Sequence, residues 1–143
     1  GCVTDSFDSE TKEYNSQPYE HLSIEDIKKA FSDFIGHQEQ KPPIFSAVKV
    51  KGERLYKKAR RGEMDFEVKS RKVVIHKLRL IEIDFPFIKF EVECTKGTYI
   101  RSLVNDIGKQ LLCGAYLYEL TRTSIGDFTL EKAIEIHEIF ESI

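Results

Sequence analysis

The sequence predicts an α+β fold in which a mixed or antiparallel sheet carries helices packed on one side. Residues 88–94 alternate apolar and polar side chains, which is the period of a strand with one solvent-exposed face. Residues 100–111 place their apolar side chains at helical spacing instead. The length of 143 residues, with 41% hydrophobic and 32% charged residues, is typical of one globular domain.

The N-terminal part is predicted to contain an irregular segment followed by a helix. Residues 1–20 are acidic and show no sustained periodicity, so a mostly exposed segment is expected, with Asp8 as a turn residue. Ser23 is a good N-cap for the helix, and Asp26 stands at the capping-box position. Gly36 is expected to end this helix. Its predicted buried stripe consists of Ile27, Ala30, Phe31, Phe34 and Ile35.

A basic stretch over residues 41–62 is predicted to contact nucleic acid. It holds eight basic residues against a single acidic one, Glu53, and aromatic residues lie between them. Basic side chains bind phosphates, while aromatic faces stack on bases. Paired prolines stiffen its start, and a short helix near Tyr56 is expected to end at Gly62. A solvated helix face is the alternative, but the pattern favours nucleic acid. The residues expected to bind it are Lys49, Lys51, Arg54, Tyr56, Arg60 and Arg61.

The sheet is predicted to occupy residues 66–123, with one helix inserted. Residues 66–76 and 78–85 are rich in Val, Ile and Leu, and Pro86 precedes a third strand. The helix that begins near residue 100 is expected to end at Gly114. Residues 115–123 favour a further strand, because Tyr116, Tyr118 and Leu120 alternate with other side chains.

A C-terminal helix is predicted over residues 129–143. Thr129 would cap it. Its expected buried stripe is Ala133, Ile134, Ile136 or His137, and Phe140.

The junction at residues 96–101 joins the third predicted strand to the inserted helix. Gly97 supplies backbone freedom, and the helix start leaves free N–H groups near two cations, Lys96 and Arg101. Such a corner is a plausible anion site. The alternative is a tight turn with a solvated lysine and an arginine paired to a surface carboxylate. The residues alone leave both open.

Composition excludes several classes of protein. Three cysteines without C-x-x-C spacing argue against a disulfide framework and favour a reducing cytoplasm. The four histidines are scattered without ligand spacing, so no metal site is expected. No apolar run has the length of a membrane helix and no leader pattern is visible, so no membrane association is expected. The chain begins at Gly1 without an initiator Met, which suggests a processed or truncated product.

Four sequence blocks together resemble the tRNA pseudouridine synthase B family. Residues 95–103, TKGTYIRSL, followed by Asp106-Ile107-Gly108, are similar to its K-G-T-Y-I-R signature. Residues 34–49 resemble its F-x-G-x-x-x-Q-x-P-P-x-[YF]-S-A-x-K block, and residues 52–62 and 1–8 match two more. The blocks occur in the same order as in the family.

This resemblance implies isomerisation of uridine to pseudouridine in the T-loop of tRNA, without a cofactor, on a base flipped out of its stack. Tyr99 would contact the flipped base, and Arg101 would pair with an aspartate nucleophile. Leu120 would lie against the uracil ring, Asp8 would complete a charge network with the arginine, and Lys96 would help to bind substrate. Residues 42–62 would be the RNA-gripping arm.

The residues alone favour simpler roles for three of these positions. Tyr99 would be a core aromatic residue, Leu120 ordinary packing and Asp8 a turn residue. Thr121 stands where the family more often has arginine, which removes a possible phosphate contact. Phe45 in place of tyrosine is a mild change.

Two family features find no match in this sequence. One is the G-x-L-D-P-x-A-T-G block with the nucleophile, and the other is a base-stacking tyrosine. We therefore expect the C-terminal part of a catalytic domain, inactive alone, whose full-length protein is a monomer that binds the tRNA T stem-loop. The alternative is a non-enzymatic RNA-binding module derived from the same fold. A third reading is a structural α+β domain that does not bind RNA.

Overall fold

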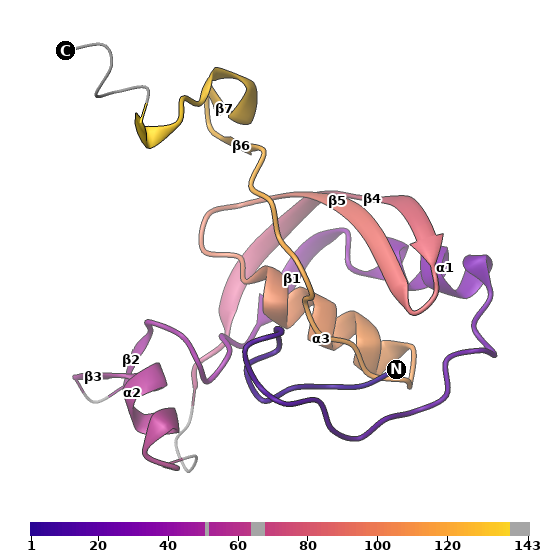
Figure 1. The fold of residues 1–143 in the computed structure, drawn as a ribbon, viewed down its shortest axis with the longest axis horizontal. Helices are drawn as coiled ribbons and strands as arrows, with labels where there is room; N and C mark the ends of the chain where they lie inside the picture. Colours follow the sequence, from indigo (N-terminus) through magenta and orange to yellow (C-terminus); the bar gives the residue numbers. More distant parts are fainter. Residues whose placement is uncertain (51, 64–67, 138–143) are drawn as a thin grey trace.

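A three-stranded antiparallel sheet covers one side of helix α3 (Ile100–Gln110) in the computed structural model, as Figure 1 shows. The structure describes residues 1–50, 52–63 and 68–137. The strand order is β1-β4-β5, with bounds Gly36–Gln40, Arg71–Asp84 and Phe87–Cys94. Helix α1 (Ile24–Asp33) packs beside α3 and contacts β4. The predicted α+β class, with an antiparallel sheet and helices on one side, is confirmed.

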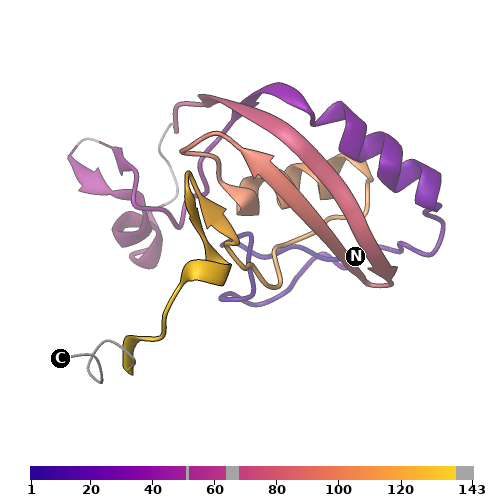
Figure 2. The same cartoon turned by 90° about the horizontal axis from the view of Figure 1, so that it is seen from above.

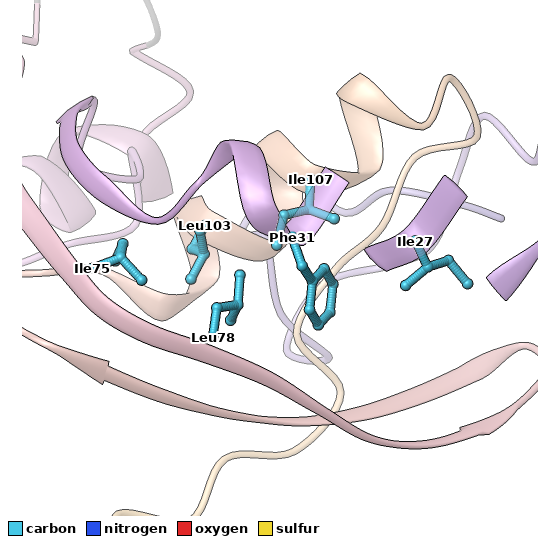
Figure 3. Packing of buried hydrophobic residues seen from close by; sticks show 6 residues of the cluster. All are labelled: Ile27, Phe31, Ile75, Leu78, Leu103 and Ile107. Carbon is cyan, nitrogen blue, oxygen red and sulfur yellow. The ribbon is translucent and has the colours of Figure 1, made fainter. Parts of the chain in front are cut away.

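The core lies where α1, α3 and β4 meet (Figure 3). Each element contributes two buried apolar side chains to it, and the ring of Phe90 on β5 packs edge-on against Phe31 at 5.4 Å between centroids. Burial of these side chains is the main force that holds the helices on the sheet. The six core residues are Ile27, Phe31, Ile75, Leu78, Leu103 and Ile107.

Helix α1 begins with the predicted capping box. The Ser23 hydroxyl accepts a hydrogen bond from the Asp26 main-chain N–H at 3.2 Å, and the Asp26 carboxylate accepts one from the Ser23 N–H at 2.9 Å. The Ser23 hydroxyl also donates to the Asp26 carboxylate at 2.6 Å, and this bond, together with that from the Ser23 N–H, lowers the pKa of Asp26 because both favour its ionised form. The predicted stripe is wrong at Ile35, which is 48% exposed. That residue lies beyond the last residue of α1 and just before β1.

The strand predictions need two corrections. Residues 71–84 form one continuous strand, not two, and residue 66 lies outside the described part. The change of pattern near Lys77 reflects an irregularity in the pairing with β5 between Ile75 and Lys77, not a chain reversal. Strand β1, with the polar sequence GHQEQ, was not predicted, and pairing with residues 71–75 makes it a strand.

The C-terminal part also differs from expectation. Residues 115–123 make a single bridge, between Leu117 and Asp8, and the next strands are the two-residue β6 (Ser124–Ile125) and β7 (Phe128–Thr129). A 3-10 helix, η1 (Leu130–Lys132), follows Thr129, so the predicted α-helix does not begin there; residues 133–135 are irregular and residues 136–137 are helical. Ile134 and Ile136 are exposed rather than buried, and Phe140 lies outside the described residues. Figure 1 shows this tail leaving the sheet, so Ile134 and Ile136 have no sheet surface to pack against.

The N-terminal segment runs along the side of α3 that faces away from the sheet (Figure 1). It is irregular, but it is not wholly exposed, since Thr4 and Ser6 are fully buried. The Leu117 N–H donates to the Phe7 carbonyl at 2.9 Å. The Tyr116 hydroxyl bonds to the Glu13 carboxylate, which raises the pKa of Tyr116 to about 12.

Figure 2 shows the β4–β5 hairpin from above, with the arm and the tail projecting beyond the sheet.

None of the helices within residues 1–50, 52–63 and 68–137 is both long and apolar enough to cross a bilayer. All three cysteines are free thiols, and Cys113 is buried.

Candidate active site

Arg101, in the first turn of α3, joins three segments that are distant in sequence. Its Nη1 donates to Asp8 Oδ2 at 2.8 Å and to the Ser6 carbonyl at 3.2 Å, while Nη2 donates to the Phe45 carbonyl at 3.0 Å. The side chains of Arg101 and Asp8 are 23% and 17% exposed, so the ion pair is largely shielded from water. The guanidinium is therefore held in one orientation by charge and by hydrogen bonds.

Asp8 is fixed as firmly as its arginine partner. Its Oδ1 accepts hydrogen bonds from the Ser6 hydroxyl and from the Glu10 main-chain N–H at 3.1 Å. Its own carbonyl accepts from the Thr4 hydroxyl at 2.7 Å. Asp8 is thus both a turn residue and the ion-pair partner of Arg101. Because both carboxylate oxygens are engaged, this carboxylate is suited to hold the arginine rather than to attack a substrate.

The junction before α3 is a turn closed by its own side chains. Gly97 has a φ of +83°, a conformation that residues with a Cβ avoid. The Thr98 hydroxyl donates to the Thr95 carbonyl at 2.8 Å. Tyr99 is the N-cap residue, and its side chain makes no capping hydrogen bond. Lys96 is exposed, whereas Arg101 is engaged with Asp8, so the anion site expected from these two cations stays a prediction.

A cleft of about 430 Å³ lies beside the Arg101–Asp8 ion pair. The predicted residues Tyr99, Arg101 and Asp8 line it together with Tyr56 and Arg60, two of the residues that were expected to bind RNA. Two predicted substrate contacts, Leu120 and Lys96, are exposed and are not part of the cleft wall. The full lining is Asp8, Glu10, Phe45, Ser46, Ala47, Tyr56, Arg60, Tyr99 and Arg101.

Sequence reasoning gave Ser46 and Gln40 no role, although both fall in a matched block. Ser46 is 4% exposed in the cleft wall, and its hydroxyl has no hydrogen-bond partner among the described residues. Gln40 is 5% exposed, and its side chain bonds to the main chain of Tyr99. For Ser46 the available signal was a polar side chain in the otherwise restricted P-P-x-F-S-A segment, whereas Gln40 lies before that segment and only its place in the matched block could have indicated it.

The basic stretch forms a separate arm that projects from the sheet (Figure 1). It consists of β2 (Lys49–Val50), β3 (Glu53–Arg54) and α2 (Leu55–Arg60), the last of which confirms the predicted short helix. Two buried prolines form its root, and Leu55 is its fully buried anchor. The Tyr56 N–H donates to the Ser46 carbonyl at 3.0 Å, which ties α2 to the cleft wall.

Some cations of the arm are neutralised by its own acids. Arg61 donates to both oxygens of Glu53, at 2.6 and 2.9 Å, and to Glu63 at 2.9 Å. Lys58 lies 3.9 Å from Glu53 and 3.7 Å from Glu63. Hydrogen bonds from Arg61 lower the pKa of both glutamates. Arg61 therefore stabilises the arm through its two ion pairs. Because these pairs engage its guanidinium, they do not support the predicted RNA contact.

Other cations of the arm remain available. The Arg60 guanidinium lies 5.6 Å from the centroid of the Tyr56 ring, a cation–π contact at the edge of the cleft. Arg54 and Lys57 are exposed and form no ion pair within the described part of the chain. Lys51 lies outside the described residues.

Within the described ranges, no three His, Cys, Asp or Glu side chains are grouped so that they could hold a metal ion.

Two family models match the chain. Residues 1–100 match the TruB family pseudouridylate synthase (N terminal domain), and residues 101–143 match the tRNA pseudouridylate synthase B C-terminal domain. The tRNA pseudouridine synthase B of Chloroherpeton thalassium is 43% identical over 143 residues, which are 100% of this chain and 59% of that protein. The enzyme of the same name from Flavobacterium johnsoniae is 46% identical over the whole chain and 62% of its own length. The chain thus spans about three fifths of these curated relatives.

A solved structure shares the fold. A chain in the crystal structure of a Cbf5–Nop10–Gar1 complex superimposes with a TM-score of 0.66 and 30% sequence identity. The match covers 84% of this chain and 31% of that chain.

Proposed function

Because the chain belongs to the TruB family of pseudouridylate synthases, we propose that it forms the arginine and tyrosine side of a site that converts uridine to pseudouridine in the T-loop of tRNA. One observation carries this proposal. Arg101 and Asp8 form a shielded ion pair in the wall of a cleft that Tyr99 and the arm residues Tyr56 and Arg60 also line. A charged centre thus lies next to the surface that we propose binds RNA.

The reaction breaks the C1′–N1 bond of uridine and forms a C1′–C5 bond. C5 loses its hydrogen to water and N1 gains a proton, so nothing is oxidised or reduced. In this site Tyr99 would contact the base, which must leave its stack to reach the cleft. Arg101 retains N–H donors beyond those that Asp8, Ser6 and Phe45 accept, and these would hold the reacting carboxylate ionised and oriented.

The isolated chain is expected to release no tritium from a T stem-loop RNA that carries [5-³H]uridine. No segment of residues 1–143 matches the family's L-D-P block, and Asp8 is engaged with Arg101, Ser6 and Glu10. Loss of the covalent nucleophile removes nearly all of the rate. The Flavobacterium johnsoniae relative, assayed on the same RNA, serves as the positive control. Tritium release by the isolated chain at a comparable rate would contradict this expectation.

The arm would grip the RNA backbone through its unpaired cations. Arg60→Ala is expected to reduce the slope of log K against log salt for T stem-loop binding by about one, because one phosphate contact is lost. Fluorescence anisotropy of a labelled stem-loop between low and moderate KCl measures this slope. The matched control is the double variant Glu53→Gln/Arg61→Gln, which removes an internally neutralised pair and should leave the slope unchanged. An equal decrease of the slope in Arg60→Ala and in the double variant would contradict the division of the arm's cations into RNA-binding and internally neutralised ones.

A further inference from the structure

We propose that Gln40 is a positioning residue that holds the base-contacting Tyr99, an inference that rests on the proposed function for the role of Tyr99. Gln40 is the last residue of β1 and is 5% exposed. Its Nε2 donates to the Tyr99 carbonyl at 3.0 Å, and its Oε1 accepts from the Tyr99 N–H at 2.7 Å. One side-chain amide thus pairs with both polar main-chain groups of a single residue.

This pairing fixes the point from which the Tyr99 side chain leaves the backbone. The N–H and the carbonyl stand on either side of the Tyr99 Cα, so holding both restrains the two dihedrals around it. Tyr99 needs this help because it is the N-cap of α3 and its own side chain makes no capping bond. Its carbonyl also accepts the first helical bond, from the Leu103 N–H at 3.1 Å. Gln40 therefore restrains the residue at which the turn becomes a helix.

The segment that carries Gln40 contacts the first turn of α3 at two more points. The Ser102 hydroxyl donates to the Lys41 carbonyl at 2.8 Å, and Arg101 Nη2 donates to the Phe45 carbonyl at 3.0 Å. The two buried prolines between Lys41 and Phe45 restrict the backbone there. This segment leads directly from the sheet into the arm. The position of the arm root and the positions of Tyr99 and Arg101 are thus mechanically linked.

Only a side chain with a donor and an acceptor on one planar group can make this pair. Methionine has the length of glutamine but offers neither strong group. An ionised glutamate has acceptors alone, so it would place an oxygen against the Tyr99 carbonyl with no proton between them. A protonated glutamate carries one donor and one acceptor and restores the pattern. Burial disfavours the ionised form, so Gln40→Glu can be switched between the two states by pH.

The first experiment follows Tyr99 by ¹⁹F NMR in protein labelled with 3-fluorotyrosine. The chain has six tyrosines, and Tyr99→Phe assigns the resonance. In Gln40→Glu the Tyr99 resonance should coincide with wild type near pH 5 and depart from it near pH 8. The Tyr99 resonance of Gln38→Glu should coincide with that of wild type at both pH values. A Gln40→Glu resonance that follows wild type at every pH overturns the proposal.

The control variant accounts for other titrating groups near Gln40. Gln38 lies on the same strand, and its Nε2 donates to the Asp33 carbonyl at 3.3 Å, away from Tyr99 in sequence. Arg71 lies opposite Gln40 on β4, Lys41 is adjacent to it, and Arg101 bonds to the same segment at Phe45, and every variant retains these three cations. Glu39, His37 and His76 lie in the same two strands, and every variant retains them. Any pH response that they cause would therefore appear in wild type as well.

A second variant keeps the proposal testable if Gln40→Glu does not fold near pH 8. Gln40→Met removes both hydrogen bonds at similar side-chain length. The Tyr99 main-chain amide should then exchange its hydrogen at least about tenfold faster, while the amide of Ile75 in the core stays protected. Unchanged exchange at Tyr99 in a folded Gln40→Met protein overturns the proposal.

Adding RNA separates this inference from the function on which it rests. Saturating T stem-loop RNA should shift the Tyr99 resonance of the wild-type chain, and Gln40→Met should reduce that shift. If the Tyr99 resonance of the wild-type chain does not shift when RNA is added, this result counts against the base contact of Tyr99. The pH response of Gln40→Glu still reports on the Gln40 pairing in that case. Equal RNA-induced shifts in wild type and Gln40→Met would overturn the positioning role.

Discussion

Arg101→Ala is expected to lower the free energy of unfolding of the chain by about 3 kcal/mol. The change leaves the Asp8 carboxylate, which is 17% exposed, without its cation and leaves the carbonyls of Ser6 and Phe45 without a donor. Urea unfolding followed by circular dichroism measures the loss. The reason is that removing one partner of a shielded ion pair costs more than the pair itself contributes.

A double-mutant cycle with Asp8→Ala isolates this pair. The double variant should be less destabilised than the sum of the two single variants, with a coupling of about 1 to 3 kcal/mol. Lys77→Ala is the control, because it removes a cation from an exposed pair with Glu91 at 3.4 Å and should cost less than about 1 kcal/mol. Strict additivity of the two changes would mean that the ion pair does not hold these segments together.

Gly108→Ala is expected to destabilise the chain by about 3 kcal/mol, although the same change in an isolated helix would stabilise it by roughly 1 kcal/mol. A Cβ at Gly108 would lie 2.2 Å from the Ala115 nitrogen and 2.6 Å from the Gly114 carbonyl carbon. These are backbone atoms, so no rotamer change can relieve the contact. Thermal and urea unfolding measure the effect.

The control for Gly108→Ala is an alanine substitution at an exposed helix position. Lys28 on α1 is exposed, and Lys28→Ala should change stability by less than about 0.5 kcal/mol. If Gly108→Ala raised the melting temperature, the segment after α3 could not pass as close to the helix as the structure places it.

Local patterns predicted the elements that local interactions hold. The Ser23-x-x-Asp26 capping box, the period of α3 and the short helix α2 depend on residues within a few positions of one another. Strand β1 has no such signal, because its polar sequence becomes a strand only by pairing with β4. Residues 115–123 illustrate the converse, since an alternating pattern without a partner strand produced a single bridge.

The candidate site divides in the same way. The sequence blocks identified Tyr99 and Arg101, and the charge pattern identified the arm. The residues alone would have left Asp8 as a turn residue, and only the resemblance linked it to the arginine, 93 positions away. The contact of Gln40 with Tyr99 spans 59 positions and could not be read from any local pattern.

By itself the sequence determined helices α1, α2 and α3, the capping box of α1, the basic character of residues 41–62 and membership of the TruB family. Those properties are set by side-chain period and composition within short windows. The tertiary structure alone decided which cations of the arm are neutralised, why Gly108 must lack a Cβ and what holds Tyr99 in place. The physical reason is that ion pairing, steric exclusion and buried hydrogen bonding depend on atoms that folding brings together from distant positions, and no pattern within one window encodes their partners.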